Sequence, residues 1–265
     1  MIERLRTEIR AIERVPVTFG HPPVPGTAPR PPACSSTGGE QAEAPPLHTL
    51  TEAGLHELKP ASHGDTPAAL GFALGMLSLT LRGSAAETAP LLWCLTESAI
   101  QEWGAPYAPG LLGFGLDPER LLIVKTQRPK EAAWVLEEGL KSGALAALLG
   151  QTEIKQPVMA RRLGLAAKSG GLPCLLLSDH GQGGLPGTLT RWRIETAASR
   201  EAKLDAKAPG LCTFHLTLER APSLPPGRSW TMEWDDEAYG FRLAPPLADR
   251  EAEAGAAQRS SAGAS

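Results

Sequence analysis

The residues with the clearest chemistry lie in a short loop between a predicted strand and a predicted helix. The loop reads Lys-Pro-Ala-Ser-His-Gly-Asp-Thr at 59–66, after a segment at 54–58 and before an apolar helix predicted over 67–81. A strand, a tight loop and a helix N-terminus form the setting in which backbone N–H groups bind nucleotide phosphates. Gly64 and Thr66 match the Gly-Lys-Thr ending of such a loop, but Asp65 stands where its lysine would. Since a carboxylate repels phosphate, the sequence predicts the architecture of a nucleotide site without its chemistry.

The composition indicates a cytoplasmic protein with no general affinity for nucleic acid. The 265 residues carry a net charge of -3, with a pI near 6.1 and only 5% aromatic residues, whereas nucleic-acid-binding domains are usually basic. The four cysteines form no Cys-x-x-Cys pair, and Cys94 and Cys174 lie in apolar runs, so we expect buried free thiols in a reducing compartment. We expect no signal peptide, because the N-terminus is charged from Glu3 onward and lacks an apolar core, and no membrane span, because the longest apolar stretch, 68–79, is too short.

Four regions follow one another along the chain. Residues 1–14 are predicted to form an amphipathic helix, since four apolar side chains recur at helical spacing, at Ile2, Leu5, Ile9 and Ile12. Residues 15–47 form a Pro-rich linker, 48–248 the folded domain, and 249–265 a tail of disordered composition. The apolar stripe of the helix must dock either on its own domain or on a partner, and the sequence leaves both open.

The folded domain alternates predicted strands and helices, which is typical of an α/β fold with a parallel sheet. Continuous apolar runs predict strands covered on both faces at 91–95, 121–125, 145–149 and 172–177, and helices are predicted at 130–142 and 157–169. The last third alternates apolar and polar residues, which predicts antiparallel strands at 190–196, 211–220, 229–234 and 239–243. Three tryptophans in these elements are expected in the core, at 93, 134 and 192.

Several segments between about 48 and 245 resemble RecA recombinases, and more closely the ImuA family of RecA-like proteins from bacterial SOS mutagenesis operons, sometimes described as SulA-like. The most specific are Tyr-Ala-Pro-Gly-Leu at 107–111 and Leu-Asp-Pro-Glu-Arg-Leu-Leu at 116–122. The run Ala-Arg-Arg-Leu-Gly-Leu-Ala-Ala-Lys-Ser-Gly-Gly at 160–171 also fits. This resemblance implies a RecA-like sheet with a degenerate nucleotide site, in which the strand at 172–177 lies between those at 54–58 and 145–149.

The resemblance also assigns each part of the RecA ATPase site to a position in this chain. The phosphate-binding lysine falls on Asp65, the magnesium-binding hydroxyl on Thr66, the water-activating carboxylate on Glu97, and the magnesium-holding aspartate on Gly150. The sensor residues fall near Ser178 and Asp179. Because phosphoryl transfer depends on positioning and charge neutralisation, these replacements imply that the chain is not an enzyme and holds no cofactor. The simplest interpretation of Glu97 is then a structural one, as a carboxylate in the first turn of a helix.

The function that the resemblance implies is that of a non-catalytic adaptor in SOS-induced translesion synthesis and mutagenesis. Its implied partners are RecA and ImuB, with an error-prone replicative-type polymerase and DNA engaged indirectly and no membrane. The helix with Ile2, Leu5, Ile9 and Ile12 is expected to bind the core of RecA.

Two alternatives remain open. The first is a RecA paralogue that binds ATP and single-stranded DNA, although the loop at 179–184 has no Lys or Arg. The second is a SulA-like inhibitor of cell division. Among individual residues, Lys59 could replace the missing lysine, and a basic helix face could contact DNA or an acidic partner, with Arg161, Arg162 and Lys168.

Overall fold

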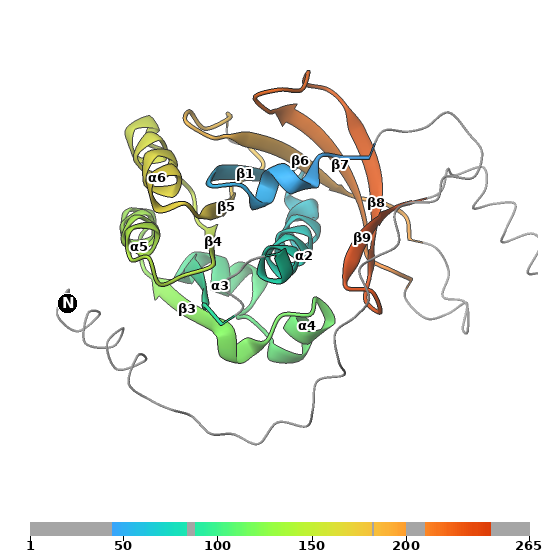
Figure 1. Cartoon of the computed structure of the whole chain (residues 1–265), viewed down its shortest axis with the longest axis horizontal. Helices are drawn as coiled ribbons and strands as arrows, with labels where there is room; N and C mark the ends of the chain where they lie inside the picture. The colour runs from blue at the N-terminus through green and yellow to red at the C-terminus, as the bar shows by residue number, and fades with distance from the viewer. Residues whose placement is uncertain (1–43, 84–87, 182, 200–209, 245–265) are drawn as a thin grey trace, which may run out of the picture. The chain divides into compact units, whose positions relative to one another are not determined.

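Hydrogen-bonded pairing joins nine strands of the described chain into one sheet, shown in Figure 1. The computed structural model describes residues 44–83, 88–181, 183–199 and 210–244. The predicted helix at 1–14, the linker up to residue 43 and the tail at 249–265 lie outside these residues. The strands are β1 Gly54–Pro60, β2 Leu91–Thr96, β3 Leu121–Thr126, β4 Ala147–Gln151, β5 Pro173–Leu177, β6 Thr190–Thr196, β7 Thr213–Arg220, β8 Ser229–Asp235 and β9 Gly240–Leu243.

Helices connect the parallel strands and cover both faces of the sheet. The α-helices are α2 Thr66–Gly83, α3 Glu97–Trp103, α4 Ala108–Gly113, α5 Pro129–Lys141 and α6 Pro157–Gly170. Short 3-10 helices are η1 Leu47–Thr51, η2 His63–Asp65 and η3 Pro118–Arg120. Within the described part of the chain, no helix combines the length and the apolar character that crossing a membrane requires.

The order of the strands is β3-β2-β4-β5-β1-β6-β7-β8-β9. This order confirms that the strand at 173–177 lies between β1 and β4 in a parallel sheet. The predicted antiparallel pairing of the strand at 190–196 is confirmed on one side only: β6 pairs antiparallel with β7 but in parallel with β1, and the β7–β8 and β8–β9 pairs are also antiparallel. The alternating pattern of β6 reflects one buried and one partly exposed face, and such a pattern does not encode the direction of a strand.

The outer strand β3 also departs from the prediction. Its apolar run predicted a strand covered on both faces, but β3 is the edge strand and Ile123 is exposed. Leu122 and Val124 are partly buried against the apolar cluster that α5 and α6 form. The apolar run therefore marked a strand correctly but overestimated how far it is covered.

The core has two layers, one on each face of the sheet (Figure 1). On one face α2 packs against β1, β6 and the C-terminal strands, with Phe72, Met76 and Trp192 fully or almost fully buried. On the other face α5 and α6 lie side by side against β2, β4 and β5. Trp93 and Trp192 lie in the core as predicted, whereas Trp134 of α5 is 36% exposed, so that prediction is wrong.

The glycine at position 75 of α2 allows the C-terminal strands to pack closely on this helix. A Cβ atom at Gly75 of α2 would lie 2.6 Å from Phe241 and 2.9 Å from Trp234, so the absence of a side chain lets β8 and β9 pack directly on the helix.

Cys94 and Cys174 are buried free thiols, as predicted, and burial raises the pKa of each to about 12. Both thiols are therefore protonated and unreactive at neutral pH.

His56 is a fully buried titratable group in the centre of the sheet. Its Nδ1 lies 2.9 Å from the hydroxyl of Thr190, and its Nε2 lies 2.9 Å from the carbonyl of Glu52. Since a carbonyl can only accept, Nε2 carries the proton and Nδ1 accepts from the hydroxyl. Burial lowers the pKa of His56 to about 4, although the hydrogen bond to Glu52 opposes this shift.

We predict that His56 makes the protein less stable in mild acid. The unfolded chain binds a proton near pH 6.5 and the folded chain only near pH 4, so stability is present above pH 6.5 and falls as the pH drops towards 4. Between pH 7 and pH 5 this single group should remove about 2 kcal/mol of the free energy of unfolding. Urea titrations at both pH values should show a smaller loss for His56→Gln, and an equal loss in both proteins would contradict the assignment.

Candidate functional site

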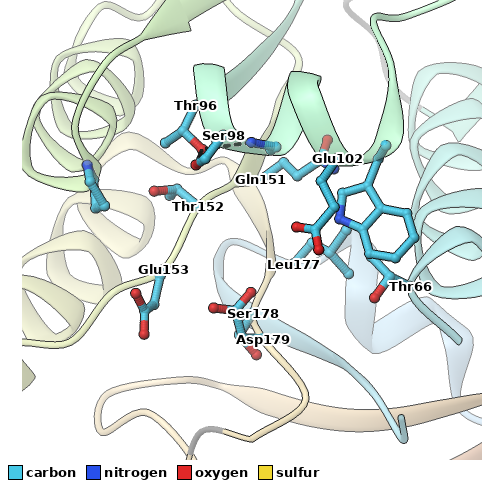
Figure 2. A pocket seen from close by; sticks show the side chains of 13 residues that line it. Thr66, Thr96, Ser98, Glu102, Gln151, Thr152, Glu153, Leu177, Ser178 and Asp179 are labelled. Atoms are coloured by element: carbon cyan, nitrogen blue, oxygen red, sulfur yellow. Dashed lines mark hydrogen bonds between the residues drawn. The ribbon is translucent and has the colours of Figure 1, made fainter. Parts of the chain in front are cut away.

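A pocket of about 150 Å³ lies where the parallel strands β2, β4 and β5 reach their carboxyl ends, shown in Figure 2. In open α/β sheets this edge is the usual place for a ligand. The starts of α2 and α5, the start and end of α3 and the loops after β4 and β5 complete its wall. The lining residues are Thr66, Thr96, Ser98, Ala99, Glu102, Trp103, Pro129, Gln151, Thr152, Glu153, Leu177, Ser178 and Asp179.

The pocket wall is acidic. It contains the carboxylates Glu102, Glu153 and Asp179, and no Lys or Arg is among its lining residues. Burial raises the pKa of Asp179, and the charges of Glu153 and Glu102 raise it further, against the opposing effect of His180 and Lys155. Near the wall, the Nζ of Lys155 lies 3.0 Å from Glu153 and the Nε2 of His63 lies 3.5 Å from Glu102. The field in the pocket therefore favours a cation over a phosphate.

The carboxylate of Asp65 holds the loop at the start of α2. Its Oδ2 accepts hydrogen bonds from the backbone N–H of Ser62 at 3.0 Å and from the Ser62 hydroxyl at 2.6 Å. Its Oδ1 accepts from the backbone N–H of Thr196 at 2.8 Å. Burial acts to raise the pKa of Asp65, but the hydrogen bonds from Ser62 and Thr196 outweigh it and hold that pKa below its usual value. Asp65 thus caps the turn η2 and ties it to the end of β6.

The two residues beside Asp65 also have local roles. The hydroxyl of Thr66 donates to the carbonyl of His63 at 2.9 Å, and Thr66 lines the pocket. A Cβ at Gly64 would meet only the Ser62 hydroxyl oxygen, 3.8 Å away, and Gly64 has no left-handed backbone conformation. Neither close approach nor backbone strain therefore requires glycine at position 64.

Glu97 and Gly150 lie near the pocket, but neither lines it. Glu97 is exposed in the first turn of α3, where Thr96 is the N-cap, which agrees with a carboxylate that favours the helix N-terminus. A Cβ at Gly150 would lie 2.6 Å from Leu136 of α5 and 3.0 Å from Leu176. Position 150 therefore faces the α5 layer, and the next residue, Gln151, is the one that lines the pocket.

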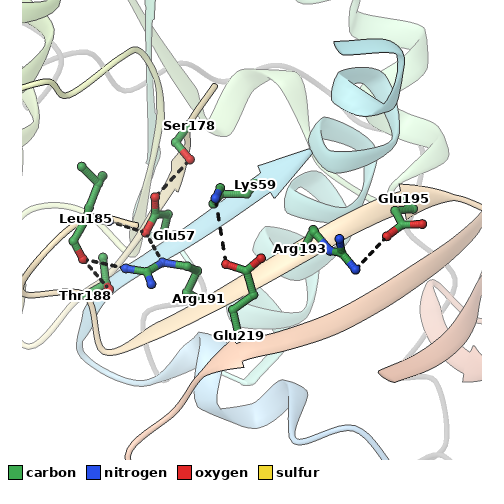
Figure 3. Close-up of polar contacts among 9 residues, drawn as sticks. All are labelled: Glu57, Lys59, Ser178, Leu185, Thr188, Arg191, Arg193, Glu195 and Glu219. Atoms are coloured by element: carbon green, nitrogen blue, oxygen red, sulfur yellow. Dashed lines mark hydrogen bonds and ion pairs between the residues drawn. The ribbon is translucent and has the colours of Figure 1, made fainter. Parts of the chain in front are cut away.

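The residues that the sequence analysis missed are Glu57 and Arg191, shown in Figure 3. Glu57 of β1 is 0% exposed, and its carboxylate accepts from Arg191 Nε at 2.6 Å, from the backbone N–H of Leu185 at 2.9 Å and from the Ser178 hydroxyl at 3.2 Å. Arg191 also donates to the carbonyl of Leu185 at 2.9 Å. A Cβ at Gly184 would collide with the guanidinium of Arg191. The buried ion pair thus anchors the segment between β5 and β6. It contacts this segment at Ser178, the residue before Asp179, and at Leu185.

The other candidate residues lie away from the pocket. Lys59 is a largely buried side chain 4.0 Å from Glu219 of β7 and does not line the pocket (Figure 3). Arg162 of α6 contacts Glu137 of α5 at 2.6 Å, while Arg161 and Lys168 are exposed on α6. The predicted partner-binding side chains Ile2, Leu5, Ile9 and Ile12 lie outside the described residues.

Comparisons with known proteins support the fold and the resemblance. No protein-family model matches the chain. The chain is 28% identical over 256 residues to Protein ImuA of Caulobacter vibrioides, in both the NA1000 / CB15N and the CB 15 strains, covering 92% of this chain and 94% of the relative. It is also similar to the crystal structure of the RadB recombinase, with a TM-score of 0.50 and 12% identity, over 74% of this chain and 92% of that one. These findings confirm the RecA-like fold and the resemblance to ImuA.

We predict that Arg191→Met destabilises the protein by about 3 kcal/mol, because it leaves the carboxylate of Glu57 buried and unpaired by any cation. The matched control is Lys59→Met, which removes a longer ion pair with a partly exposed partner and should cost about 1 kcal/mol or less. Urea unfolding monitored by circular dichroism measures both. The double variant Glu57→Gln, Arg191→Met should recover part of the loss. Equal effects of Arg191→Met and Lys59→Met would contradict an anchoring role.

Proposed function

We propose that this chain is a non-catalytic RecA-like adaptor in SOS-induced translesion synthesis, which binds RecA and ImuB. The main support for a non-catalytic role is the position of Asp65. In a phosphate-binding loop this position holds a lysine next to the bound anion, whereas here the carboxylate of Asp65 accepts hydrogen bonds from the chain itself at the start of α2. The similarity to ImuA over 92% of the chain supports a role in mutagenesis. Under this proposal Asp65, Gly64 and Thr66 form a vestigial loop, and no cofactor is used.

The electrostatics of the pocket argue against binding of a nucleotide there. A phosphate placed about 4 Å from one carboxylate meets a repulsion of about 4 kcal/mol at an effective dielectric constant near 20. The pocket has three carboxylates in its wall and no Lys or Arg among its lining residues, and of these carboxylates Glu153 pairs with Lys155 beside the pocket. Gln151, the residue of β4 that lines the pocket, is neutral and a poor ligand for magnesium compared with a carboxylate. Glu97 is outside the pocket wall, so it is poorly placed to activate a water molecule there.

The same features argue against direct binding of single-stranded DNA at this edge. The segment after β5 carries Asp179 and His180 and no Lys or Arg before Arg191. Backbone contacts to DNA depend on such cations. We therefore propose that DNA is engaged through the partners, with the error-prone replicative-type polymerase also engaged indirectly.

The N-terminal segment is the proposed contact to RecA. Its apolar stripe has four side chains at helical spacing, at Ile2, Leu5, Ile9 and Ile12. A helix this short is marginal in isolation and gains stability by packing its stripe on another surface. The Pro-rich segment at 15–47 would tether it and raise its effective concentration at a partner that the folded domain already holds.

We predict no measurable ATP hydrolysis by the wild-type chain, and none by Asp65→Lys, because a lysine at position 65 leaves the acidic pocket wall unchanged. The same substitution should lower the free energy of unfolding by about 1 kcal/mol, since Ser62 and Thr196 lose their shared acceptor. A coupled phosphate-release assay and urea unfolding measure the two effects. Steady wild-type hydrolysis that disappears in Glu97→Gln would contradict the non-catalytic proposal.

We predict that Leu5→Asp with Ile9→Asp weakens the association with RecA and leaves the melting temperature of the chain nearly unchanged. A pull-down with purified RecA and ImuB, using the full-length chain, the double variant and a chain without residues 1–14, measures the association. The matched control is Thr7→Asp with Ala11→Asp, which adds the same two aspartates at uncharged positions off the apolar stripe. A double variant that melts several degrees lower and still binds RecA would mean that the helix braces its own domain instead.

A further inference from the structure

The face of α6 that points away from the sheet has an apolar centre. Val158 and Leu165 of this helix are 63% and 67% exposed. They are seven residues apart, so they lie on the same side of the helix, about 10 Å from one another along its axis. The opposite face of α6 packs on the sheet with Ala160, Leu163 and Ala167. Because the outward face of a surface helix is ordinarily polar, core packing does not account for the two exposed apolar side chains.

Two cations border this apolar centre on one side only. Arg161 and Lys168 are exposed, are also seven residues apart, and fall on the same side of the apolar centre at helical spacing. Within the described part of the chain, neither cation is held by an ion pair or a side-chain hydrogen bond. On the other side, Arg162 is paired with Glu137 of α5 at 2.6 Å. The outward face of α6 therefore has one positive edge that no carboxylate neutralises among the described residues.

A close backbone contact fixes the helix beside this positive edge. A Cβ at Gly187, in the segment between β5 and β6, would lie 3.1 Å from the Cα of Arg161. A Cβ at Gly164 of α6 would lie 2.5 Å from the carbonyl oxygen of Gly187. The ion pair of Glu57 with Arg191 anchors the same segment. Since α5 packs on the other side of α6 (Figure 1), the outward face is pre-organised for a partner.

A second copy and the two ends of the chain fit this face poorly. In a symmetric dimer the same patch meets itself, which would place Arg161 and Lys168 against their own copies. Residues 1–14 contain four Arg and three Glu, so their charge does not complement a positive edge. The tail at 249–265 has acidic residues but no large apolar side chain to pack on Val158 and Leu165.

Nucleic acid and lipid also fit poorly. The affinity of proteins for DNA comes from several phosphate contacts, whereas this face offers two unpaired cations beside an apolar centre. A helix that binds a lipid surface buries a broad apolar face, and α6 exposes only Val158 and Leu165 as large apolar side chains within the described residues. An amphipathic helix with carboxylates beside its apolar stripe supplies both kinds of contact at a spacing of seven residues.

We propose that this face of α6 binds an acidic amphipathic helix of a protein partner. The apolar side chains of that helix pack on Val158 and Leu165, and its carboxylates pair with the cations of the positive edge. The inference rests on the proposed adaptor function and adds one binding surface with the chemistry of its ligand. Carboxylates on the α5 side of the surface would contribute little, because Arg162 is already paired there.

The first test uses synthetic peptides on the full-length chain. The probe is a fluorescein-labelled helical peptide with leucines seven residues apart on one face and glutamates at the same spacing beside them. Fluorescence anisotropy should show saturable binding that weakens with added salt. Versions with glutamine or lysine in place of glutamate should bind about tenfold more weakly or not at all. Absent binding of the glutamate peptide, or equal binding of the glutamine version, would overturn the proposal.

Variants of the chain then locate the surface. Val158→Thr with Leu165→Gln removes the apolar centre at nearly constant side-chain size. Arg161→Gln with Lys168→Gln removes the two charges of the positive edge. Each pair of substitutions should weaken binding of the glutamate peptide by about tenfold. Thermal melting should show that both variants remain folded, because all four side chains are exposed.

Matched controls make the same changes elsewhere on the surface. Leu112→Gln replaces a leucine of α4 that is 55% exposed. Lys130→Gln with Arg220→Gln removes two exposed cations outside α6. Both controls should leave the affinity for the glutamate peptide unchanged, and a loss equal to that of the α6 variants would overturn the proposal. Duplex DNA or phosphatidylglycerol vesicles that displace the peptide, or a dimer that Val158→Thr with Leu165→Gln dissociates, would also overturn it.

A pull-down with purified RecA and ImuB tests whether the surface serves the proposed adaptor. Val158→Thr with Leu165→Gln should reduce the capture of at least one of the two proteins several-fold. Unchanged capture of both would overturn the inference about α6 and leave the adaptor function standing. A wild-type chain that binds the glutamate peptide but captures neither protein would contradict the adaptor function and support the surface.

Discussion

The buried ion pair between Glu57 and Arg191 is the interaction on which the candidate site depends. A carboxylate that is 0% exposed is tolerated only with partners, and Glu57 accepts hydrogen bonds from Arg191, Leu185 and Ser178. These bonds fix the segment between β5 and β6 against β1, in the middle of the sheet. Asp179 directly follows Ser178, so the acidic wall of the pocket takes its position from this pair.

Asp65 is a second carboxylate whose hydrogen bonds hold a segment in place, in the turn before α2, and its neighbour Thr66 lines the pocket. A loop at a helix N-terminus offers N–H groups that need an acceptor, and Asp65 supplies an acceptor from within the chain. Its second oxygen bonds the end of β6 through the N–H of Thr196, so the loop and the strand are held together without a bound anion. A lysine at this position would neither cap the turn nor reach β6 in this way. The carboxylate of Asp65 therefore has a structural role at the start of α2.

The sequence predicted the positions of the strands and helices better than the order and pairing of the strands. Apolar runs located β2, β4 and β5 to within two residues, because strands covered on both faces have no polar positions. The place of β5 between β1 and β4 came from the family resemblance, since periodicity carries no strand order. Glu57 was missed because an acidic residue within a strand ordinarily indicates an exposed face, and its partner is 134 residues away. Gly150, to which the resemblance assigns the magnesium-holding aspartate, faces Leu136 of α5, and the next residue, Gln151, lines the pocket.

Different residues determine the shape of the pocket and its charge. The apolar residues of β1, β2, β4 and β5 fix a crevice at the carboxyl edge of the sheet, whatever ligand it binds. The sign of charge in that crevice depends on residues that follow the strands, such as Glu153 and Asp179, and on Glu102 of α3. These side chains contribute little to core packing, so the wall could become acidic while the RecA-like core stayed intact. The same geometry that suits a phosphate when lined by cations then suits a cation when lined by carboxylates.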